Sequence, residues 1–188
     1  MSKSDSSASK KERNKTVSWV VTIFFVTILV SGTISFASDA IMAGSSMLVA
    51  FVILLAIILI GIVFDVIGVA VTSADEKPFH SMAARKVPGA QESIRLLRKA
   101  ERVSSICNDV VGDICGIVSG TTGAVIVLEI QQKFGLRALF VSIVVTALIS
   151  GLTIGGKAVG KEIAMKKSKQ VVYFVAKLIP SRLLGKKK

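Results

Sequence analysis

Hydrophobic residues are concentrated in four long stretches of this 188-residue chain, and charged residues fall mainly between them. A helix needs about 20 apolar residues to cross the hydrocarbon core of a bilayer, and each stretch is long enough. The pattern therefore predicts an all-α membrane protein with four transmembrane helices. The predicted spans are residues 17–37, 46–71, 106–128 and 136–155.

Lysine and arginine are unevenly distributed among the segments that connect these spans. The N-terminal segment 1–16, the connection 73–102 and the tail from Lys157 are basic, whereas the connection 38–45 has no Lys or Arg. Basic segments stay on the cytoplasmic side. The distribution predicts a multi-pass protein of the cell membrane with both termini in the cytoplasm.

Composition agrees with this placement, because 52% of the residues are hydrophobic while the net charge is +12. Apolar residues belong in lipid, and basic residues belong at the lipid surface. In isolation the basic tail would attract nucleic acid. Beside four spans, the anionic headgroups of the inner leaflet are the nearer partner, so we expect lipid and no nucleic acid.

The N-terminal region has two interpretations. Residues 1–16 are rich in Ser and Lys and are predicted to be disordered. The apolar segment 17–37 is longer than a usual signal-peptide core, which favours an uncleaved membrane anchor. A cleaved signal peptide is the alternative, with Ser35-Phe36-Ala37 as the cleavage site.

Two segments outside the spans alternate apolar and basic residues at helical spacing. In the connection 73–102, residues 91–101 predict a helix with Ile94 and Leu97 on one side and basic residues around them. The tail 165–188 predicts a similar helix that Pro180 ends. Amphipathic helices of this kind lie on a membrane surface, so both are predicted to contact the inner leaflet.

Acidic residues occur where the spans should exclude water. A carboxylate at membrane depth is costly unless it is paired, hydrated or bound to a cation, so each one indicates a functional site. Carboxylate and amide oxygens suit hard cations such as Mg²⁺. The candidate metal ligands are Asp65, Asn108, Asp109 and Asp113.

Each candidate also has a structural interpretation. Asp109 and Asp113 are four residues apart, and they would pair with Lys99 or Arg102 if they lie in the headgroup region. Asp65 would reach the interface or pair with Lys157. The sequence leaves these alternatives open.

Glycines recur every four residues beside the paired aspartates, at Gly112, Gly116 and Gly120. Small residues at this spacing let another helix approach closely. A second series on the fourth span, which includes Gly156 and Gly160, is interpreted in the same way. No nucleophile elbow, phosphate-binding loop or zinc-ligand spacing occurs, so we expect that the protein is not an enzyme.

Four segments between Asp65 and Ala164 resemble the membrane domain of the CNNM/CorB/CorC magnesium transporters, and they lie in the region 46–164. They are the small-residue end of the second span, a helix that ends in Leu-Leu, the polar start of the third span and the end of the fourth. Here they read Asp65-Val-Ile-Gly-Val-Ala-Val-Thr-Ser-Ala-Asp75, Pro88-Gly-Ala-Gln-Glu-Ser-Ile-Arg-Leu-Leu97, Asn108-Asp-Val-Val-Gly-Asp113 and Gly156-Lys-Ala-Val-Gly-Lys-Glu-Ile-Ala164.

The resemblance implies a homodimeric bundle that binds or transports Mg²⁺ or another divalent cation. Two departures bear on this expectation. Lys157 stands where the family has a membrane-embedded glutamate, and the 188 residues contain no counterpart of the regulatory CBS domains. The alternative is therefore a non-transporting scaffold or accessory subunit that kept the bundle and lost the ion site. That alternative predicts a pairing of Lys157 with Asp65 or with an aspartate of the third span.

Overall fold

The computed structural model of the chain describes residues 3–42, 46–135 and 138–179, and these residues are helical with no β-strand among them. The all-α prediction is confirmed for this part of the chain. In chain order the elements are α1 (Lys3–Met42), α2 (Met47–Ser73), α3 (Lys77–Ala84), α4 (Ala90–Leu97), α5 (Ala100–Ser105), the π-helix η1 (Ile106–Gly112), α6 (Asp113–Phe134), α7 (Ala138–Lys166) and α8 (Ser168–Leu178).

Among the described residues, four helical segments are long and apolar enough to cross a membrane, as the sequence predicts. They are Thr16–Ser38, Met47–Ser73, Ala100–Phe134 and Leu139–Lys166. The third and fourth extend well beyond the predicted bounds, because hydropathy locates the hydrocarbon core and not the end of a helix. Helix α6 ends where Gly135 adopts a left-handed conformation (φ 60°), the usual role of glycine after a helix.

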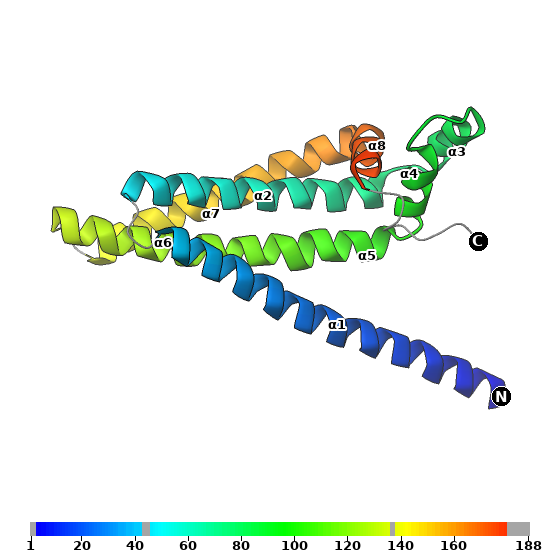
Figure 1. Cartoon of the computed structure of the whole chain (residues 1–188), viewed down its shortest axis with the longest axis horizontal. Coiled ribbons are helices and arrows are strands. Elements are labelled where there is room, and N and C mark those ends of the chain that lie inside the picture. The colour runs from blue at the N-terminus through cyan, green and yellow to red at the C-terminus, as the bar shows by residue number, and fades with distance from the viewer. Residues whose placement is uncertain (1–2, 43–45, 136–137, 180–188) are drawn as a thin grey trace.

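Helices α2, α6 and α7 run side by side, and α1 diverges from them (Figure 1). The most apolar window of the α1 span has no buried residue. Ile23, Val30 and Ile34 of α1 pack against a buried cluster that includes Val110 and Ile114. This contact is small, so among the four candidate spans of the described residues α1 is the least buried by the rest of the chain.

A second contact holds α1 near its basic end. The Arg102 guanidinium lies over the Trp19 ring, 5.0 Å from its centroid. The sequence offers Arg102 as one of two alternative basic partners for Asp109 and Asp113. In the structure its guanidinium contacts the Trp19 ring, because a guanidinium is attracted to the face of an indole ring.

Helix α1 begins at Lys3, within the segment 1–16 for which composition predicts disorder. The backbone of this segment continues the helix of the apolar span. Lys, Glu, Arg and Ala are good helix formers, so a helix that already exists can extend through them at low cost.

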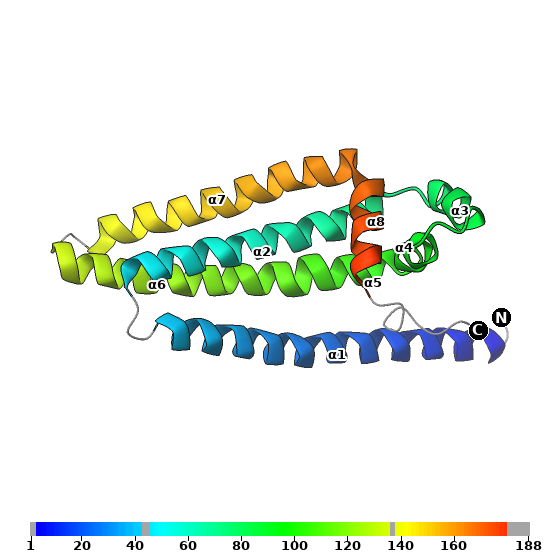
Figure 2. The ribbon, with the colours of Figure 1, turned by 45° about the horizontal axis from the view of Figure 1, so that its top comes forward.

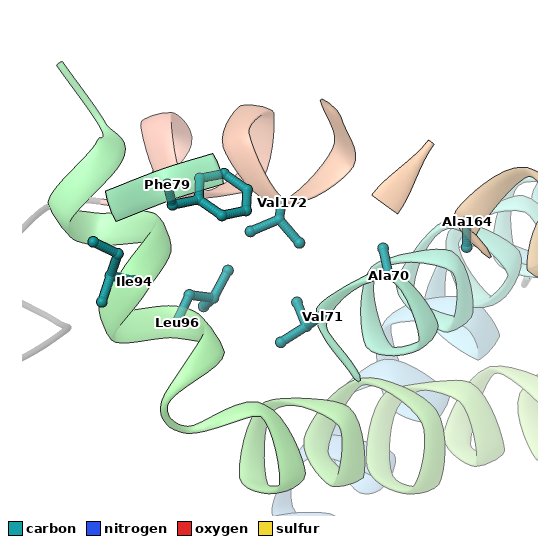
Figure 3. Close-up of a cluster of buried hydrophobic side chains, with 7 residues drawn as sticks. All are labelled: Ala70, Val71, Phe79, Ile94, Leu96, Ala164 and Val172. Carbon is teal, nitrogen blue, oxygen red and sulfur yellow. The ribbon is translucent and has the colours of Figure 1, made fainter. Parts of the chain in front are cut away.

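Short helices cover the end of the bundle where α2 terminates. Phe79 of α3, Leu96 of α4 and Val172 of α8 are completely or almost completely buried there, against Ala70 and Val71 of α2 (Figure 3). We call this group of helices, α3, α4 and α8, the cap.

The structure of the cap differs from the prediction of a single helix over 91–101. The helix expected over 91–101 is divided into α4 and α5, with a break at Arg98 and Lys99. Of the predicted apolar side, Ile94 is buried within the protein and Leu97 is half-buried; Leu96 beside them is also buried. The apolar face of α4 packs on α8 and α3, which bury it within the protein.

The start of α1, the end of α2 and the end of α7 lie at the same end of the molecule as the cap (Figures 1 and 2). Four spans require this arrangement if both termini are on one side of the membrane. The assignment of that side to the cytoplasm is still a prediction from the basic residues.

Candidate functional site

Asp65 is a buried carboxylate inside the membrane-spanning part of α2. The residue is 4% exposed and lies eight positions before Ser73, the end of α2, which corresponds to about 12 Å along the helix axis. Its Oδ1 atom is 3.7 Å from Lys157 Nζ, and its Oδ2 atom is 3.7 Å from Lys161 Nζ. The predicted pairing of Asp65 with Lys157 is confirmed.

Close packing of α7 on α2 brings the lysines to Asp65. A Cβ atom at Gly160 would lie 2.7 Å from Val66 Cγ2, and a Cβ at Gly156 would overlap the Ile62 side chain. Larger residues at these two positions would therefore push the helices apart. Lys157 and Lys161 are one turn apart on α7, so both face the same carboxylate. The packing interpretation holds for Gly156 and Gly160.

The π-helix η1 forms another side of the site. A Cβ atom at Gly112 would lie 3.4 Å from Lys157 Nζ and 3.9 Å from Asp65 Oδ1, so the glycine leaves room for the ion pair. One turn away, Asn108 packs directly on Gly68 of α2, where a Cβ would overlap the Asn108 amide. The Asn108 Nδ2 group donates a hydrogen bond to Ser104 Oγ at 3.2 Å.

Two oxygen atoms at this contact have unused acceptor capacity. Asp65 Oδ2 and Asn108 Oδ1 are buried and accept no hydrogen bond. Asp65 Oδ2 has only its longer ion-pair contact with Lys161, at 3.7 Å. Buried polar atoms are nearly always hydrogen-bonded, so a buried oxygen without a hydrogen bond requires an explanation, such as a bound water or ion. Their position beside a π-helix adds weight, because π-bulges occur frequently at functional sites. We call the group Asp65, Asn108, Lys157 and Lys161 the polar centre.

The other two predicted ligands do not join the polar centre. Asp109 and Asp113 are both exposed at the bundle surface. Asp113 is two residues from Cys115, which packs against Gly61 of α2, so Asp113 projects from roughly the opposite side of α6. Within the part of the chain that the structure describes, no three His, Cys, Asp or Glu residues converge as a metal site.

Asp113 nevertheless lies at membrane depth. Gly112 is level with Asp65, and Cys115 is level with Gly61, so Asp113 lies between these levels. The Arg102 guanidinium, one of the two basic partners predicted for the aspartates, lies over the Trp19 ring. An exposed carboxylate at this depth requires water, a cation or another helix.

The predicted glycine series on α6 is only partly used within the chain. Gly112 contacts the ion pair, whereas a Cβ atom at Gly116 or Gly120 would meet nothing within 4 Å. These two glycines line a groove between α6 and α7 together with Ser119, Thr146 and Ser150. Their small size is therefore not explained by packing inside one copy of the chain.

The sequence interpretation missed two members of the site, Lys161 and Ser104. Neither is among the predicted site residues, although the four-residue spacing of Lys161 from Lys157 signals a shared partner. Ser104 has the same spacing from Asn108. Cys107 and Cys115 are both buried, and neither forms a disulfide.

Comparison with known proteins gave no match: neither a protein-family model, nor a curated protein, nor a solved structure is similar to this chain. Conclusions about function therefore rest on the residues of the polar centre.

Proposed function

We propose that this chain is a multi-pass membrane protein that binds or transports a divalent cation, with Mg²⁺ as the first candidate, at the polar centre. The observation that carries the proposal is the pair of buried oxygens, Asp65 Oδ2 and Asn108 Oδ1, that accept no hydrogen bond. Mg²⁺ prefers oxygen ligands and is commonly held by only one or two carboxylates, with water completing its shell.

The donor chemistry fits such a cation, whereas the local charge opposes it. One carboxylate and two ammonium groups give the trio Asp65, Lys157 and Lys161 a net charge of −1 + 1 + 1 = +1. A divalent cation must therefore displace at least one ammonium group. Lys161 is the easier one to displace, because its side chain is 51% exposed whereas that of Lys157 is 23% exposed.

Mg²⁺-dependent thermal stabilisation of the full chain in detergent tests this proposal. A ligand that binds only the folded state stabilises it by about 4 kcal/mol at a thousandfold excess over its Kd. We expect Mg²⁺ to raise the Tm of the wild-type protein and to act at lower concentrations on Lys161→Gln, because one competing charge is gone. Asp65→Asn should abolish the response.

Controls locate the ion within the protein. Asp109→Asn combined with Asp113→Asn should keep the Mg²⁺ response, because these carboxylates lie outside the polar centre. Loss of the response in this double variant alone would move the site to the outer face of α6. An unchanged Tm with Mg²⁺ in both the wild type and Lys161→Gln would refute cation binding.

The ion pairs themselves favour a second candidate, a non-transporting scaffold or accessory subunit. In that case Lys157 and Lys161 neutralise Asp65 permanently and fix α7 on α2. The scaffold is supported if Mg²⁺ has no effect on any variant while substitutions at Asp65 still destabilise the bundle.

The homodimer that the resemblance implies is also a proposal, and the groove between α6 and α7 supports it. Gly116 and Gly120 are open there, as a partner helix would require. We expect Gly120→Leu to lower the mass of the protein–detergent complex to that of one copy and to leave its helix content unchanged. Equal masses for Gly120→Leu and the wild type would contradict a dimer through this groove.

A further inference from the structure

Helix α8 crosses the end of the bundle at an angle to the spans (Figure 2). It begins at Ser168, directly after the end of α7 at Lys166, so it lies where the fourth span leaves the membrane. Its inner side packs on the rest of the cap and on α2: Val172 and Ala176 are buried, and the Tyr173 hydroxyl donates a hydrogen bond to the Pro88 carbonyl at 3.1 Å.

The opposite side of α8 is apolar and has no partner in the described part of the chain. Phe174 is 63% exposed and Leu178 is 67% exposed, and the two are one helical turn apart. Phe174 is two residues from Val172, or about 200° around the helix, so the two side chains project in nearly opposite directions. A helix with its polar side outward would not expose these residues.

Basic residues surround this apolar face. Lys167, Lys169 and Lys177 are exposed, and α8 contains no Asp or Glu. The nearby Glu162 carboxylate is bound to Lys166 Nζ at 2.6 Å, so it does not neutralise these three lysines. Lys167 and Lys177 lie on the same side of the helix as Phe174, whereas Lys169 is five residues from Phe174, or about 140° around the helix. We call Phe174, Leu178, Lys167 and Lys177 the α8 outer face.

We propose that the α8 outer face docks on an anionic lipid leaflet, with Phe174 and Leu178 inserted among the acyl chains and the lysines on the headgroups. The spans place a bilayer beside α8, and helices that combine exposed aromatic and aliphatic residues with lysines bind the membrane interface. Positive charge selects anionic headgroups. A second copy fits this face poorly, because its lysines would oppose the same lysines. This proposal is independent of cation binding at the polar centre.

Quenching by brominated lipids tests the docking directly. Trp19→Phe removes the only tryptophan, and Phe174→Trp then places a single indole on the α8 outer face. The full chain is reconstituted in phosphatidylcholine with brominated acyl chains, with or without phosphatidylglycerol. We expect quenching that increases when phosphatidylglycerol is present. Lys167→Gln and Lys177→Gln together should remove that increase.

A positive control is Leu59→Trp in the same Trp19→Phe background, because Leu59 is exposed on α2 within a span. Its indole should be quenched in both membranes, regardless of the lysines. If Leu59→Trp is quenched while Phe174→Trp is quenched in neither membrane, the outer face is covered by water or protein and the proposal is wrong. Equal quenching with and without phosphatidylglycerol would overturn the selection of anionic lipid.

Discussion

Asp65→Leu is expected to destabilise the folded protein by about 3 kcal/mol, because it leaves the Lys157 ammonium without a counter-charge inside the bundle. Removal of one partner of a buried ion pair is costly, since the remaining charge keeps its desolvation penalty. The expected value is at the lower end of the usual range because Lys161 is half exposed and can turn toward water. Thermal unfolding in detergent measures the effect.

A double-mutant cycle shows whether the cost comes from the pair. Asp65→Leu combined with Lys157→Met removes both charges, and we expect it to recover much of the lost stability. Glu162→Gln is a matched control, because it removes a carboxylate from an exposed ion pair, that with Lys166. Exposed pairs contribute about 0–1 kcal/mol. An effect of Asp65→Leu no larger than that of Glu162→Gln would show that the Asp65 pair is not energetically important.

Phe79→Ala is expected to destabilise the cap by about 3–5 kcal/mol, because the Phe79 side chain is completely buried between α2, α4 and α8. The substitution removes apolar contacts and leaves a cavity that the short helices cannot fill completely. Since the cap covers the end of α2, we expect α3 and α4 to become sensitive to protease before the spans unfold. Thermal unfolding and limited proteolysis measure the two effects.

Phe174→Ala is the matched control for Phe79→Ala. It removes the same side chain from the exposed side of α8, so it should change stability in detergent only slightly. If the two variants had equal Tm values, the buried cluster of the cap would not contribute to stability.

The candidate site was partly predictable from the sequence. An acidic residue within the second span and a lysine near the end of the fourth indicate an ion pair, because neither charge is stable alone in lipid. Lys161 and Ser104 follow from the same four-residue spacing. The sequence could not show that Asp109 and Asp113 face away from Asp65, because that depends on how α6 is rotated about its axis.

The sequence by itself determined the number of spans, the basic end of the bundle and the presence of a helix before Pro180 in the tail, because these depend on hydropathy and charge along one chain. The tertiary structure decided which sides of the helices meet. Gly68 and Gly160 allow close contacts at particular points, and those contacts select Asn108 and Lys161 for the polar centre. In the structure the apolar side of α4 is covered by protein, whereas part of the apolar side of α8 is exposed. An amphipathic pattern shows that a face must be covered, and only the packed structure shows what covers it.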